Sequence, residues 1–268
     1  MDVRKTYKLF VNGEFVRSES GRAYRPDGVV NVPRGSRKDL RDAVRAARTA
    51  FPGWAGRTAM NRGQILYRAA EMLDGRAAQF VELLGGGVRA RRELERSVET
   101  LVWYAGWTDK LPQVTGTVNP VAGPYFNFTI PEPTGVVAIV APERDALSGL
   151  VRRLAPVLCG GNVVVALTAE SQPLAALTLA EVLATSDVPA GVVNIISGQR
   201  KELLPWLSSH MDINAIDTAG CTTDEIKAIE ESAAGNVKRV IKLTKDEMSP
   251  YLISAFMEMK TVWHPIGV

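Results

Sequence analysis

The chain has 268 residues, of which 46% are hydrophobic and 23% charged, enough apolar material for one large domain or for one domain with a small appendage. Its net charge of +3 comes from 32 basic and 29 acidic residues, an excess too small and too scattered to indicate a nucleic-acid-binding surface. Two cysteines and two histidines exclude a disulfide framework and leave too few ligands for a zinc site.

The first residues, MDVRK, lack the apolar run of a signal peptide, and no stretch approaches transmembrane length. We therefore expect a cytoplasmic protein with no membrane partner, in keeping with its sparse cysteines.

The N-terminal part begins with an expected hairpin and continues with helices. Residues 7–16 alternate around Asn12-Gly13, a dipeptide that supplies the positive φ angles of a tight hairpin turn. Apolar positions then recur at helical spacing over 37–51, 60–73, 77–84 and, after the break at 85–87, up to residue 105. Ser36 is placed to cap the first of these helices.

The pattern changes after Pro112. Residues 114–121 and 125–130 are expected to be extended, because prolines and glycines bound them. Residues 135–142 form a continuous apolar run typical of a buried parallel strand. Helices at 147–158, 173–185, 201–209 and 223–233 then alternate with strands at 162–166, 192–196, 213–217 and 237–243. This alternation predicts a doubly wound α/β domain.

Several motifs, in order, resemble the aldehyde dehydrogenase superfamily. They are EPTGVV at 132–137, LAPVLCGGN at 154–162 and VPAGVVNIISG at 188–198. The similarity runs from about residue 7 to residue 239. The resemblance implies a Rossmann-like cofactor domain, which we assign to residues 1–112 and 132–248.

The resemblance then skips to the far C-terminus of the family. KTV at 260–262 is similar to a strand of the family's oligomerisation arm, and 114–130 is similar to the other arm strands. A pair of strands alone would be a poor unit without such a third strand, although an unrelated strand tail is the alternative. We assign residues 113–131 and 249–268 to a small β oligomerisation arm and expect the catalytic domain to be absent, removed near Pro250–Tyr251.

The family's catalytic cysteine belongs to that missing domain, and we expect Cys159 and Cys221 to be inert. The oxyanion asparagine corresponds here to Arg144, and the glutamate of the general-base motif corresponds to Leu243. We therefore predict no catalytic residue and no metal ligand in this chain.

The cofactor motifs are also altered. The ribose-binding lysine corresponds to Leu167, and only Glu170 of that motif is kept. In the phosphate turn GCTTDE at 220–225, the second glycine has become Glu225, beside Asp224. Two carboxylates in the first turn suit the helix dipole but repel a pyrophosphate.

Residual cofactor contacts, if any, are expected at Pro142, Glu170, Gly220 and Cys221. We expect no bound cofactor, or NAD(P) if any. The joint losses favour a non-catalytic pseudoenzyme that forms homo-oligomers or joins a full-length aldehyde dehydrogenase. The alternatives are an NAD(P)-dependent aldehyde dehydrogenase working with a partner subunit and a nucleotide sensor without turnover.

Overall fold

A computed structural model describes residues 5–242 and 248–267. The body is built on a seven-stranded sheet of order β11-β10-β7-β8-β9-β1-β2. Strands β7 to β11 are parallel, and β1 and β2 add an antiparallel edge. The strands are β1 Leu9–Val11, β2 Glu14–Val16, β7 Val136–Val140, β8 Val163–Leu167, β9 Val193–Ile196, β10 Ala215–Asp217 and β11 Arg239–Ile241.

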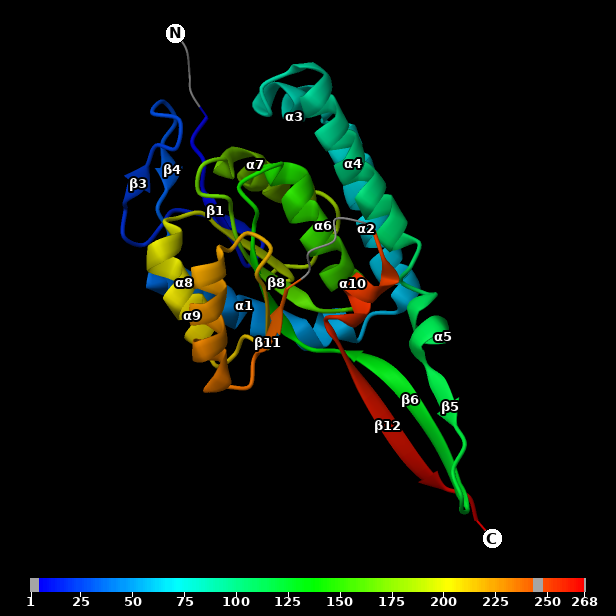
Figure 1. Cartoon of the computed structure of the whole chain (residues 1–268). Helices are drawn as coiled ribbons and strands as arrows, with labels where there is room; N and C mark the ends of the chain where they lie inside the picture. Colours follow the sequence, from blue (N-terminus) through cyan, green and yellow to red (C-terminus); the bar gives the residue numbers. More distant parts are fainter. Residues whose placement is uncertain (1–4, 243–247, 268) are drawn as a thin grey trace.

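Helices cover both faces of this sheet (Figure 1). On one face, helix α1 packs against β7, β8 and β9, and α8 packs against α1 and α9. On the other face, α6 and α7 cover the sheet, and α2, α3 and α4 form an outer layer against them. Strands β7 and β8 are buried at every position, as their β-branched runs predict. The Rossmann-like α/β fold is confirmed. The helices are α1 Arg37–Ala55, α2 Ala59–Asp74, α3 Ala77–Leu83, α4 Gly87–Ala105, α6 Ala146–Cys159, α7 Pro173–Ala184, α8 Arg200–Ser209 and α9 Thr223–Ala234.

The predicted hairpin and the first cap are both present. Asn12 and Gly13 have φ angles of 54° and 77° and join β1 to β2 in register. Ser36 accepts hydrogen bonds from the amides of Lys38 and Asp39 at the start of α1. The helix continues four residues beyond the expected end, through Pro52, because buried Trp54 anchors its last turn.

A second, three-stranded sheet of order β12-β6-β5 projects from the body (Figure 1). It consists of β5 Thr117–Asn119, β6 Tyr125–Pro133 and β12 Met257–Pro265, and we call it the arm sheet. Strands β6 and β12 pair antiparallel over nine residues. The third strand expected from the sequence is thus present and pairs with the proline-bounded segment.

Four short elements were not expected. Helix α5 (Leu111–Thr115) replaces the start of the extended stretch predicted at 114–121, because Pro112 suits a first helical turn and Leu111 is buried. Helix α10 (Pro250–Ser254) leads into β12. Strands β3 (Ala23–Tyr24) and β4 (Val32–Pro33) form a two-stranded sheet.

Candidate functional site

The candidate site is the crevice where the strand order reverses, between the carboxyl ends of β7 and β10. Open α/β sheets bind their ligands at this position. The loops after the two strands are in direct contact, since the Gly220 amide donates to the Val140 carbonyl at 3.0 Å. A Cβ atom on Gly220 would lie 2.2 Å from the Ala141 carbonyl oxygen. Close packing between these loops therefore requires a glycine here, whether or not a phosphate binds.

An arginine from α8 crosses the crevice. One guanidinium nitrogen of Arg200, Nη2, lies 2.6 Å from Glu143 Oε1. The other, Nη1, donates to the Gly220 carbonyl at 2.6 Å and lies 3.5 Å from Glu225 Oε2. The Arg200 side chain is only 12% exposed. It links the loops after β7 and β10 to the first turn of α9.

The Glu143 side chain is hydrogen-bonded to the loop that follows β8. Its carboxylate accepts hydrogen bonds from the Glu170 and Ser171 amides at 2.9 and 3.0 Å and from the Ser171 hydroxyl at 2.6 Å. Partial burial acts to raise the pKa of Glu143, but these hydrogen bonds and Arg200 together lower it below its usual value. The carboxylate is therefore ionised at neutral pH.

Three helices that start at this edge of the sheet hold carboxylates of the chain itself at their N-termini. Glu93 accepts from the Leu147 and Ser148 amides of α6. Glu170 accepts from the Arg200 amide of α8 at 2.9 Å, and Glu225 accepts from the Thr222 amide before α9 at 2.8 Å. Free helix N-termini attract phosphates. Here internal anions already occupy these amides.

A cavity of about 570 Å³ lies beside this network. Three carboxylates face it, together with Tyr24 from β3, whose pKa is raised by burial and then by Glu170 and Glu143. Three cations, Arg25, Arg200 and Lys201, line the same cavity, and Arg200 already pairs with Glu143 and Glu225. The lining residues are Tyr24, Arg25, Pro26, Glu143, Glu170, Ser171, Arg200, Lys201 and Glu225.

The four residues named from the sequence as residual cofactor contacts all lie at this edge of the sheet. Pro142 is half-buried over Gly149, where an added Cβ would meet its ring at 3.2 Å. Glu170 and Gly220 belong to the Arg200 network, and Cys221 is half-buried next to them. The sequence did not single out Arg200 or Glu93. Neither residue lies in a motif that carries the family resemblance, so each was visible in the sequence only as a charged residue.

Neither cysteine has the environment of a nucleophile. Burial raises the pKa of the Cys159 thiol to about 12. Burial, and then the Glu225 carboxylate, raises the pKa of the Cys221 thiol to about 12. Both are therefore protonated at neutral pH. Arg144, at the oxyanion position, is exposed, and Leu243, at the general-base position, lies outside the described residues.

Two further properties of the described part bear on function. Within residues 5–242 and 248–267, no group of three metal-ligating side chains gathers. No helix of that part combines the length and apolar character needed to cross a membrane.

The sequence matches the aldehyde dehydrogenase family over residues 18–244. The chain belongs to the aldehyde dehydrogenase family. It is 35% identical to retinal dehydrogenase 2 of Mus musculus, over 94% of this chain and 51% of that protein. It is 32% identical to omega-crystallin of Enteroctopus dofleini, over 88% of this chain and 50% of that protein.

Solved structures agree with the sequence comparison. An aldehyde dehydrogenase from Bacillus cereus, solved as an NAD+ complex, superimposes with a TM-score of 0.81 at 29% identity. The match covers 88% of this chain and 50% of that one. The present chain thus spans about half the length of the family members that it matches.

Proposed function

We propose that this chain is a non-catalytic member of the aldehyde dehydrogenase family that acts through oligomerisation. The observation that carries the proposal is the state of the crevice, in which Arg200 forms ion pairs with Glu143 and Glu225. A dinucleotide would have to displace this ion pair and compete with carboxylates for the same amides. The residues present do not fit NAD(P), and we assign no chemical step to it.

The loss of catalytic groups supports the same proposal. Both described thiols are protonated and shielded, and a family thioester mechanism needs a thiolate beside an oxyanion donor. Because the chain matches only about half of its relatives, the activity of those proteins does not transfer to it.

The arm sheet supports the oligomerisation half of the proposal. Its described strands expose Val118, Phe126, Ile130, Val262 and Trp263. The outer backbone edges of β5 and β12 have no neighbouring strand within the described structure. Exposed apolar side chains beside open strand edges favour pairing with another chain. We propose a second copy of this chain or a full-length aldehyde dehydrogenase as the partner.

Native mass spectrometry after co-expression with a full-length aldehyde dehydrogenase of the same cell tests the assembly. We expect complexes that contain this chain, and expect Val262→Lys together with Trp263→Lys to abolish them. Val88→Lys, at an exposed apolar position of α4, is the matched control and leaves them intact. If only homo-oligomers form, the proposed assembly with a full-length aldehyde dehydrogenase is wrong. If the chain is strictly monomeric, the proposed oligomerisation is wrong.

One observation favours a second candidate, an NAD(P)-dependent aldehyde dehydrogenase that works with a partner subunit. The fold superimposes on a relative solved with NAD+, and Glu170 and Gly220 are retained. This candidate requires an aldehyde-dependent rise in NADH absorbance when the chain is added to its partner. Our proposal expects no rise beyond the partner's own rate.

A further inference from the structure

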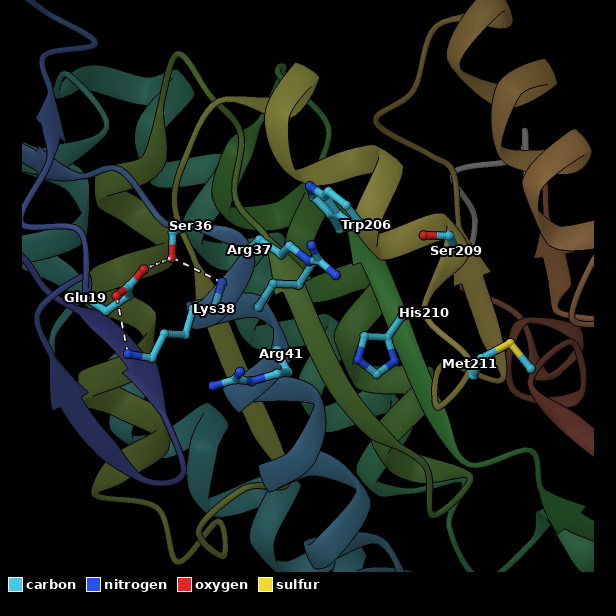
Figure 2. A pocket seen from close by; sticks show the side chains of 10 residues that line it. Glu19, Ser36, Arg37, Lys38, Arg41, Trp206, Ser209, His210 and Met211 are labelled. Atoms are coloured by element: carbon cyan, nitrogen blue, oxygen red, sulfur yellow. Dashed lines mark hydrogen bonds and ion pairs between the residues drawn. The ribbon is translucent and has the colours of Figure 1, made fainter.

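A cavity of about 650 Å³ lies between the start of α1 and the end of α8 (Figure 2). We call it the α1–α8 cavity. It shares no lining residue with the cavity beside the Arg200 network. Its volume is in the range of small-molecule sites, so a ligand here would be independent of the family's cofactor position.

The charges that line the α1–α8 cavity are mostly positive. Arg37, Lys38 and Arg41 contribute cations, against the single carboxylate of Glu19. These cations sit in the first two turns of α1, where positive charge opposes the helix dipole. The Asp39 carboxylate does not neutralise these cations in the cavity, because it is buried and accepts hydrogen bonds from the Ser18 hydroxyl and the Ser36 amide.

Arg37 is the cation best placed to receive an anion. Lys38 pairs with Glu19 at 3.3 Å and Arg41 pairs with Asp42 at 2.9 Å. Arg37 has no carboxylate partner among the described residues, and its guanidinium carbon lies 3.7 Å from the centroid of the Trp206 ring. A guanidinium held on an aromatic ring keeps its in-plane N–H groups available, and their spacing matches a carboxylate.

His210 adds a donor on the same wall. Its Nδ1 accepts a hydrogen bond from the Asp212 amide at 3.2 Å. This bond assigns the proton of the neutral ring to Nε2, which is then free to donate. Figure 2 shows the His210 ring between the α1 arginines and Met211.

The cavity also offers apolar surface for a ring. Trp206 is 41% exposed and Met211 is 74% exposed, and both line the same space. Exposed tryptophan and methionine next to unpaired arginine suit an aromatic ligand that carries an anionic group. A ligand with only one of these features would leave either the cation or the apolar surface unused.

We infer that the α1–α8 cavity binds a small aromatic carboxylate, with Arg37 and His210 holding the carboxylate and Trp206 and Met211 contacting the ring. The inference does not depend on whether the chain is catalytic or oligomeric. A small aromatic carboxylate has neither the two nucleosides nor the pyrophosphate of a dinucleotide, so it is a different class of ligand from NAD(P).

Calorimetric titration of the full chain with 1-naphthoate tests this assignment. The matched probes are 1-naphthalenemethanol, which keeps the rings, and acetate, which keeps the carboxylate. We expect 1-naphthoate to bind at least tenfold more tightly than either. Arg37→Ala and Trp206→Ala are each expected to weaken it at least tenfold without changing the melting temperature by more than a few degrees.

Two controls keep the result interpretable. Arg25→Ala, at the other cavity, should leave the affinity for 1-naphthoate unchanged, and Arg37→Lys should restore part of the loss in Arg37→Ala. The inference is overturned if 1-naphthoate binds no better than the neutral alcohol, or if folded Arg37→Ala binds it normally.

Discussion

Individual side chains at the carboxyl edge of the sheet accept hydrogen bonds from backbone amides at helix N-termini. Arg200 is the centre of this network, because it reaches both Glu143 and the Gly220 carbonyl. Gly220 itself is required by its contact with Ala141. A family glycine can thus be retained for packing alone, and its presence is weak evidence for phosphate binding.

The contact between Gly220 and β7 gives a first test at this scale. Gly220→Ala places a methyl group against backbone that cannot move aside, and we expect a loss of about 3 kcal/mol in the free energy of unfolding. Urea denaturation measures it. Gly53→Ala, in a helix with open space around the glycine, should be neutral or stabilise by up to about 1 kcal/mol. Equal effects of the two changes would contradict the packing explanation.

The hydrogen bonds of Glu143 predict a pH dependence. Because the folded chain lowers the pKa of Glu143, this carboxylate stabilises the fold at pH values above its unfolded pKa, and the contribution is lost as pH falls through the folded value. Glu143→Gln should cost about 1 kcal/mol at pH 7, given partial exposure. It should also flatten the acid side of a stability profile measured by urea denaturation. An unchanged acid limb would refute this assignment.

The raised pKa of each thiol predicts slow alkylation. At pH 8 we expect iodoacetamide to modify Cys159 and Cys221 at least about 100-fold more slowly than glutathione, since little thiolate is present and access is limited. Mass spectrometry of native and guanidinium-unfolded protein measures the rates. If either thiol of the native protein reacts as fast as glutathione, the prediction is wrong and that cysteine becomes a candidate nucleophile.

At the scale of elements, the junction between body and arm is tightly built. Asn162 is fully buried; its side-chain oxygen accepts from the Gly135 amide at 2.8 Å, and its side-chain nitrogen donates to the Phe256 carbonyl at 2.9 Å. Phe256 and Ile253 are also buried, so the segment leading into β12 is part of the core. The arm sheet is therefore held at a defined position on the body.

Asn162→Ala tests this junction. The change leaves the Gly135 amide buried without its acceptor, and we expect a cost of about 2–3 kcal/mol. Hydrogen exchange over β12 should also speed up relative to β7. Asn31→Ala, at an exposed turn, serves as the control and should change stability by less than about 0.5 kcal/mol. Unchanged exchange in β12 would show that the arm does not depend on Asn162.

Periodicity predicted the elements of the body well, because β7 and β8 are continuous apolar runs and α1 carries a cap and a regular apolar face. It missed α5, where Pro112 starts a helix instead of bounding a strand. It also could not predict the Arg200 network, since Glu143 and Glu225 lie far from Arg200 in sequence and meet it only when parallel strands align their carboxyl ends. The carboxylates of the phosphate turn were expected to repel a pyrophosphate. The structure adds that Arg200 is the cation that pairs with Glu225.

At the scale of the whole molecule, the chain combines the cofactor-type fold of the aldehyde dehydrogenase family with a projecting arm sheet, within about half the length of its relatives. Internal ion pairs cross the crevice, whereas the arm sheet exposes apolar side chains and open edges. This distribution favours a role in assembly over a role in turnover. The α1–α8 cavity adds a separate position at which a small molecule could bind.

Calorimetric titration with NAD and with NADP tests the central claim most directly, namely that internal ion pairs exclude a dinucleotide from the crevice. We predict no saturable heat from either cofactor up to millimolar concentration, both in the native chain and in Arg37→Ala, which is the control for binding outside the crevice. Saturable binding in Arg37→Ala that is weakened by Glu170→Ala would contradict the account.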